Sequence, residues 1–280
     1  MTSLRLVLAA SVLVFAGAVA ACSDTPPGVA ATAASTTSTV TTASPPTTAR
    51  TTVPDTTVPD TTVPVVTETR QIGTSLEGRS ITAIRRGEVG GRVVLVIGVI
   101  HGDEAAGAQV VDRLEQLEVP AGVDLWLVPS MNPDGQSAVD RHNANQVDLN
   151  RNFPYRWGPI GVPGDGQYAG TGPASEPETQ SMVAFIDEIR PDLVIWYHQD
   201  LFRIAPGTGR DGVIRARYAE LVGLPVVSIT GGTYTGVAAT WARQSIDPGV
   251  AFIVELGPTL SDAEADVHAR AVLVVASEPN

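Results

Sequence analysis

Two patterns of apolar and polar positions alternate along the chain from about residue 67 onward. Continuous aliphatic runs, typical of strands buried on both faces, are separated by stretches whose apolar positions recur at helical spacing. The pattern predicts strands at 93–99, 123–128, 193–197, 226–229 and 251–254, and helices at 110–117, 177–189, 213–221 and 261–275. Alternating strands and helices predict a single α/β domain, 67–280, with a mostly parallel mixed sheet and helices on both faces.

The N-terminal segment lacks this periodicity. Residues 1–21 resemble a secretory signal peptide, because Arg5 precedes a short apolar stretch that ends in small residues. That stretch is shorter than the ~20 apolar residues that a membrane-spanning helix needs. The sequence Val19-Ala20-Ala21-Cys22 resembles the bacterial lipoprotein cleavage box, in which the cysteine is lipidated. Cleavage nearby that leaves a free thiol is the alternative.

The next segment has the composition of a tether. Residues 23–66 contain no Leu, Ile, Met or aromatic residue, and TTVPD repeats at 51–55 and 56–60. Such a chain cannot bury enough apolar surface to offset its ordering entropy, and its prolines favour an extended, semi-rigid conformation. We therefore expect a disordered tether at 22–66. The folded domain would be extracytoplasmic and anchored to a bacterial cell membrane, or secreted if Cys22 is not lipidated.

Composition and charge exclude several classes of function. Acidic residues outnumber basic residues 30 to 18, and all 18 basic residues are arginines. Without lysine the chain has neither a Schiff-base lysine nor the P-loop lysine that reaches nucleotide phosphates. The net charge of −12 argues against a nucleic-acid partner, whose usual footprint is a basic stripe. The single cysteine excludes internal disulfides and a cysteine-ligated zinc site.

Chemically reactive side chains follow the predicted strands. His101 and Glu104 follow the first strand, His198 follows the strand at 193–197, and Glu255 follows the strand at 251–254. The carboxyl ends of parallel strands meet at one edge of a sheet, where ligands bind. Two histidines and one glutamate are a known ligand set of catalytic zinc. For His198 alone, a buried structural histidine is the alternative.

Glu255 and the two remaining histidines carry further expectations. Partial desolvation after an apolar run should raise the pKa of Glu255 toward the range of a general base. A capping or salt-bridged glutamate is the alternative. We expect His142 in a polar loop and His268 solvated on a charged helix face.

Five motifs carry a resemblance to a known family. They are HGDE at 101–104, NPDG at 132–135, VDLNRNFP at 147–154, SEPET at 175–179 and ELGP at 255–258. In order and spacing over residues 67–280 they resemble the zinc carboxypeptidases of the carboxypeptidase A type. The run Arg141-His142-Asn143 and the later SEPETQ most resemble bacterial murein peptide amidases, which cleave the bond between γ-D-glutamate and meso-diaminopimelate.

The resemblance implies one zinc ion per chain, a peptide substrate from the cell wall and a role for each matching residue. By this resemblance, zinc is bound by His101, Glu104 and His198, and Asp148 orients His101. The terminal carboxylate of the substrate is bound by Asn150 and Arg151. Arg141 stabilises the oxyanion, and Glu255 transfers the proton.

Two positions depart from the family pattern. Tyr234 lies about two positions from the family's mobile, substrate-binding tyrosine, so a packing role is equally open. Ala239 and Thr240, where the family lines its specificity pocket, are too small to indicate the residue accepted. Two rival functions remain open: an N-acyl amino-acid deacylase of the aspartoacylase type, and a non-catalytic peptidoglycan-binding lipoprotein. NPDG and SEPET favour the peptidase, and the intact Glu255 argues against a silent protein.

Overall fold

The computed structural model describes residues 66–246 and 249–278. The predictions for the signal peptide (1–21), for Cys22 and for the tether lie outside these residues, except that the first strand includes Val66. Within the described residues, no helix combines the length and the hydropathy that crossing a bilayer requires.

The described residues form seven strands and six α-helices, joined in places by short turns. The strands are β1 (Val66–Thr74), β2 (Ser80–Gly87), β3 (Arg92–Ile97), β4 (Val123–Val128), β5 (Leu193–Gln199), β6 (Arg203–Ile204) and β7 (Val250–Leu256). The helices are α1 (Ala106–Leu114), α2 (Pro133–Ala138), α3 (Pro177–Ile189), α4 (Gly209–Val222), α5 (Ala238–Ser245) and α6 (Asp262–Ser277), and η1 (Leu149–Arg151) is a 3-10 turn.

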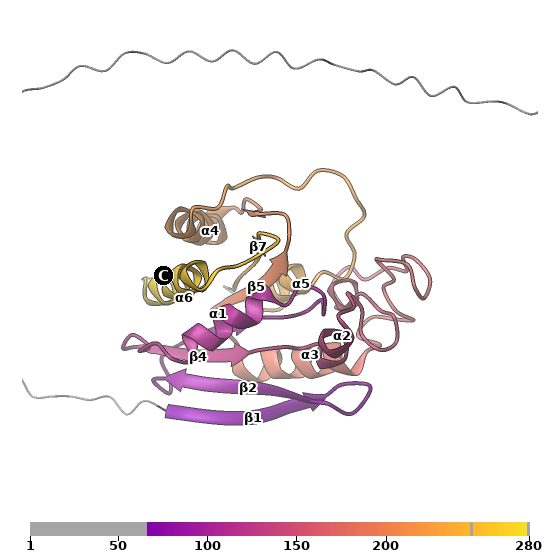
Figure 1. The fold of residues 1–280 in the computed structure, drawn as a ribbon, viewed down its shortest axis with the longest axis horizontal. Helices are drawn as coiled ribbons and strands as arrows, with labels where there is room; N and C mark the ends of the chain where they lie inside the picture. Colours follow the sequence, from indigo (N-terminus) through magenta and orange to yellow (C-terminus); the bar gives the residue numbers. More distant parts are fainter. Residues whose placement is uncertain (1–65, 247–248, 279–280) are drawn as a thin grey trace, which may run out of the picture. The chain divides into compact units, whose positions relative to one another are not determined.

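The strands build one mixed sheet in the order β1-β2-β4-β3-β5-β7-β6 (Figure 1). Its central strands β4, β3, β5 and β7 are parallel, while β1 and β2 extend one edge and β6 the other by antiparallel pairing. The predicted mixed sheet with helices on both faces is thus confirmed. The antiparallel hairpin β1–β2 was not among the predicted strands, because half-exposed alternating strands lack the continuous apolar run of a buried strand.

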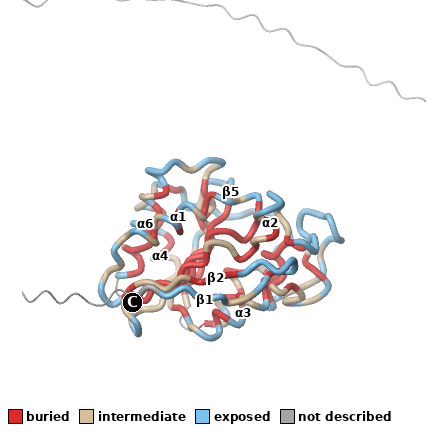
Figure 2. Tube along the Cα trace, turned by 60° about the horizontal axis from the view of Figure 1, so that its bottom comes forward, coloured by how far each residue is buried: buried red, intermediate tan, exposed pale blue. Residues whose placement is uncertain are grey.

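Side chains of the central strands alternate between two cores. Residues such as Val94 and Val96 pack with α1, α4 and α6, whereas Leu95 and Ile97 pack with α3 and α5. This follows from the two-residue period of a strand, and burying each such side chain contributes roughly 1.5–3 kcal/mol. Buried residues accordingly run through the middle of the sheet in Figure 2.

Two predictions from the sequence are wrong, one for residues 226–229 and one for His268. Residues 226–229 form no strand; only Val226 makes an isolated bridge, to Ile204, and Val227 and Ile229 are exposed. His268 is not solvated but buried, because α4 packs against that face of α6 and Tyr218 hydrogen-bonds to its Nδ1 at 2.8 Å.

Candidate active site

Strand register brings two of the predicted site residues together. In the parallel pair β5–β7, His198 lies directly opposite Glu255. Because side chains alternate along a strand, both lie on the face of the sheet that α5 covers. Trp196 and Ala251 lie on the same face. Registered neighbours on one face of a sheet have their side chains within contact range. The sheet alone therefore sets His198 beside Glu255.

A tight loop after β3 presents His101 and Glu104. Gly102 is packed so closely against Gly135 that a Cβ at Gly102 would lie 1.9 Å from the carbonyl carbon of Gly135. The glycines of HGDE and NPDG thus let two backbones touch. Asn132 secures the contact, since its side chain caps α2 by accepting from Gly135 and donates to the carbonyl of Ile100 at 3.0 Å.

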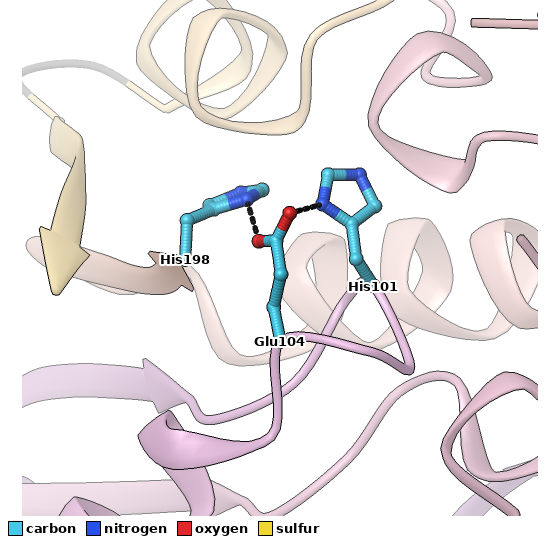
Figure 3. Close-up of side chains that lie close together, drawn as sticks. All are labelled: His101, Glu104 and His198. Carbon is cyan, nitrogen blue, oxygen red and sulfur yellow. Dashed lines mark hydrogen bonds and ion pairs between the residues drawn. The ribbon is translucent and has the colours of Figure 1, made fainter. Parts of the chain in front are cut away.

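Three side chains converge on one point. Glu104 accepts hydrogen bonds from the Nδ1 atoms of His101 at 2.9 Å and of His198 at 2.8 Å (Figure 3). One ligand atom from each of the three residues lies within 4.8 Å of the others. Among the described residues this is the one such cluster of metal-ligating side chains. It joins the loop after β3 to the end of β5, nearly a hundred residues later in the chain.

The donor set fits a zinc ion. Two imidazoles and one carboxylate match a catalytic zinc site. While the Nδ1 of His101 faces Glu104, its Nε2 contacts Asp148 at 2.9 Å, and such a carboxylate usually orients and supports a metal-binding imidazole. Burial raises the pKa of Glu104, but hydrogen bonds from His101 and His198 outweigh it and hold that pKa well below its usual range. The buried carboxylate stays ionised, which favours a bound cation.

Arg141 borders this cluster. Its guanidinium donates to Glu104 at 2.9 Å and to Asp148 at 2.8 Å, and its Nε donates to the carbonyl of Gly166. Burial raises the pKa of Asp148, but the charge and hydrogen bond of His101, together with the charge of Arg141, outweigh it and hold that pKa well below its usual range. Arg141 is therefore a cation held at the edge of the predicted metal site.

Asn150 and Arg151 lie on the turn that follows Asp148. The Oδ1 of Asn150 accepts from the backbone of Ala238 at 3.0 Å, which ties this turn to the start of α5. The Nε of Arg151 is buried without a hydrogen-bond partner among the described residues. The ring of Tyr234 lies 5.1 Å from the Arg151 guanidinium, and the tyrosine itself is half exposed. A bound anion would accept a hydrogen bond from this unpaired donor of Arg151.

Glu255 has the environment that the sequence predicts. Burial raises its pKa to about 7, with a further contribution from the negative charge of Glu104. Its Oε2 is buried and has no hydrogen-bond partner among the described residues. A carboxylate with a pKa near neutrality can accept and return a proton at physiological pH.

A cavity of about 650 Å³ unites these groups. It reaches from the His101–Glu104–His198 cluster past Glu255 to α5, where the predicted pocket residues Ala239 and Thr240 form part of its wall. Asp148 lies behind His101. Sequence reasoning missed four polar residues of the cavity wall: Gln199, Arg203, Arg215 and Arg243. The helical spacing of Arg243 from Thr240 was the available signal for that arginine.

Comparisons with known proteins agree with this geometry. Residues 60–200 match the model of a family described as zinc carboxypeptidase. Murein peptide amidase A of Escherichia coli (strain K12) is 31% identical over 182 residues, which cover 61% of this chain and 73% of the relative. Murein peptide amidase A of Vibrio campbellii (strain ATCC BAA-1116) is 28% identical over 193 residues, covering 65% and 76%.

Solved structures share the fold. Carboxypeptidase A from Helicoverpa armigera superposes with a TM-score of 0.68 at 20% identity, covering 76% of this chain and 68% of that one. Murein-tripeptide amidase from Escherichia coli O157 superposes with a TM-score of 0.61 at 27% identity, covering 76% and 93%.

Proposed function

The chain belongs to the zinc carboxypeptidase family, and from that premise we propose that it hydrolyses the γ-D-glutamate–meso-diaminopimelate bond of cell-wall stem peptides. Membership makes the protein a peptide-hydrolysing enzyme with zinc as its cofactor. The observation that carries the proposal is one cavity lined by Glu255, Arg151 and the His101–Glu104–His198 cluster. The similarity to murein peptide amidases supports the choice of bond.

We assign zinc binding to His101, Glu104 and His198, with Asp148 holding His101. Zinc bound there supplies Lewis-acid chemistry, which activates water and polarises the scissile carbonyl. Glu255 then takes a proton from the attacking water and returns it to the leaving amine. Its pKa of about 7 suits both transfers, because proton exchange is most efficient when the pKa lies near the working pH.

Three cavity residues position the substrate in this mechanism. Arg151 and Asn150 hold the terminal carboxylate, since the Arg151 guanidinium is buried with an unused donor. Arginine suits this role because its planar fork binds a carboxylate through two parallel hydrogen bonds. Arg141 stabilises the negative charge that develops on the carbonyl oxygen, which is usually the largest contribution in acyl transfer. Tyr234 covers Arg151 from the solvent side and contacts the substrate there.

We place the enzyme outside the cytoplasm, tethered to the membrane by a lipid on Cys22. Murein lies outside the cytoplasmic membrane, and the signal-like segment before Cys22 supports export. Intact-mass analysis of the mature protein tests the tether: a diacylglycerol adduct on an N-terminal Cys22 supports it. An unmodified N-terminus would refute the lipid anchor.

Mass spectrometry of products tests the activity. The purified protein is incubated with L-Ala-γ-D-Glu-meso-diaminopimelate, beside an ordinary L-peptide. We expect free diaminopimelate, abolished by a chelator and by Glu255→Gln but not by Glu220→Gln, a change at an exposed glutamate of α4. Cleavage of only the L-peptide would make the enzyme a general carboxypeptidase instead.

A further inference from the structure

The far wall of the cavity is built at an open sheet edge. Strand β6 is only two residues long and pairs with β7 at Glu255 and Val254, so the carbonyl of Ala251 has no strand partner on that side. Arg243 of α5 donates to this carbonyl at 2.6 Å, and Arg215 of α4 donates to it at 3.0 Å. Two guanidinium groups from opposite faces of the sheet therefore meet at one oxygen.

These two arginines differ in how their charge is balanced. Arg215 forms an ion pair with Asp211 at 2.8 Å. Arg243 donates only to neutral oxygens, those of Ala251 and Thr240, and no ion pair links it to a described residue. Burial lowers the pKa of Arg243, and the positive charge of Arg215 lowers it further. Arg243 is thus a partly buried cation that a carboxylate would stabilise.

A second cation without a direct ion pair lies nearby on β6; its charge acts on Glu255 from a distance and lowers the pKa of that carboxyl. Arg203 is directly opposite Glu255 in the antiparallel ladder, so both side chains project from the same face. Its Nε is buried without a hydrogen-bond partner, and no ion pair within 4 Å joins it to a described residue. Arg203 and Arg243 line the same cavity, with Ile253 of β7 in its wall.

The cavity is far more cationic than the protein as a whole. The chain carries a net charge of −12, yet five of its 18 arginines line this one cavity. Arg141 is bound to Glu104 and Asp148, Arg215 to Asp211, and Arg151 is assigned to the terminal carboxylate of the substrate. Arg203 and Arg243 have no anionic partner assigned to them, and the proposed mechanism uses neither.

We propose that Arg203 and Arg243 bind a second carboxylate, carried on the side chain of the residue that the enzyme releases. This inference rests on the proposed function and adds to it the chemistry of the specificity pocket. A dicarboxylic terminal residue, such as diaminopimelate or glutamate, would satisfy both arginines through charge-assisted hydrogen bonds. A terminal lysine, whose side chain ends in an ammonium group alone, would be repelled by the same pair.

Two pairs of substrates isolate that carboxylate. Peptides ending in glutamate or in glutamine differ only in charge, and tripeptides ending in meso-diaminopimelate or in L-lysine differ only by the distal carboxylate. We expect kcat/KM to be about tenfold or more higher for the acidic member of each pair, the usual effect of a hydrogen-bonded charge. In Arg203→Gln and in Arg243→Gln the ratio should fall to within about threefold of unity. Arg217→Gln, on the outer side of α4, should keep the wild-type ratio.

The ratio is taken within each variant, so a loss of folded protein or of zinc cancels. If Arg243→Gln does not fold, Arg243→Lys keeps a cation, and Arg203→Gln removes no hydrogen bond to a described residue. A wild-type ratio of one or less, or a high ratio unchanged in both glutamine variants, would overturn the inference.

Binding separates this inference from the proposed reaction. Calorimetry with the Glu255→Gln protein measures the Kd of each intact peptide without turnover. Tighter binding of the acidic members, lost when Arg203 or Arg243 is also replaced, supports the pocket even if no bond is cleaved. Equal Kd values within each pair would overturn the pocket even if the enzyme is an active amidase.

Discussion

Two buried clusters lie back to back on β5. Its consecutive residues Tyr197 and His198 project to opposite faces of the sheet, because strand side chains alternate. On one face, His198 belongs to a charged cluster with His101, Glu104 and Asp148. On the other face, Tyr197 begins a tyrosine cluster, in which its hydroxyl bonds to Tyr218 and Tyr218 bonds to His268.

Both clusters contain buried histidines, but carboxylates of the described residues contact only those of the charged cluster. In the charged cluster, burial lowers the pKa of His101, but the charge and hydrogen bonds of Asp148 and Glu104 outweigh it and raise that pKa. In the tyrosine cluster, burial lowers the pKa of His268 to about 4, with no carboxylate close enough to reverse it. Burial without a strong carboxylate partner thus lowers the pKa of His268, and it also lowers the pKa of His198, which hydrogen-bonds to one carboxylate, that of Glu104. Of these three histidines, only His101, held between two carboxylates, has a raised pKa.

The largest expected difference between the clusters is in activity. Glu255→Gln, next to the charged cluster, should lower kcat by about 10³-fold, within the usual range for losing a general acid–base group. Its stability should be unchanged or higher, because a raised carboxyl pKa means that folding disfavours the ionised form. Steady-state kinetics and urea unfolding measure the two effects. A parallel loss of activity and stability would contradict the assignment.

The next effect is the pH dependence of stability that His268 causes. In the unfolded chain its pKa is near 6.5, and in the folded protein it is about 4. As pH falls from 6.5 to 4 the unfolded state binds a proton that the folded state refuses, so stability decreases, by roughly 3 kcal/mol. Urea unfolding of the wild type and of His268→Gln across this range should diverge by that amount. Parallel curves would refute the neutral, buried histidine.

A smaller effect is expected for zinc affinity. Asp148→Asn keeps the shape of the side chain but removes the charge behind His101, and such supporting groups are typically worth 10–100-fold in metal affinity. Competition with a chromophoric chelator measures the zinc Kd. Asp124→Asn, which removes another buried carboxylate, paired with Arg85 at 2.8 Å, is the control. Equal loss in both variants would show that general destabilisation, rather than support of His101, is responsible.

The smallest expected effect is a loss of stability without a loss of activity, and it concerns the tyrosine cluster. Tyr218→Phe leaves the hydroxyl of Tyr197 and the Nδ1 of His268 without this partner, at a cost of about 1–2 kcal/mol. Activity should not change, since Tyr218 lies on the opposite face from the cavity. Unfolding and kinetics are compared with Tyr155→Phe, which removes a hydroxyl outside the cluster. A fall in kcat without loss of stability would connect the tyrosine cluster to catalysis.

Local sequence was enough to predict the central sheet and the composition of the metal site. Strand β4 was predicted with the bounds it has, and α3 likewise, because continuous apolar runs and helical spacing are local consequences of burial. His101, Glu104 and His198 could be selected because each lies at or just after the end of a buried strand, and the ends of parallel strands share an edge. Local pattern and the rules of strand order suffice for both conclusions.

Which polar side chains are buried together depends on the packing of elements that are distant in the chain. His268 looked solvated on α6 because its buried partner, Tyr218, comes from α4, fifty residues earlier. Arg203, Arg215 and Arg243 belong to three separate elements, and they share a cavity because β6 ends early and leaves the edge of β7 open. Charge balance and desolvation depend on neighbours that are distant in the chain, and these neighbours are set by packing rather than by local sequence.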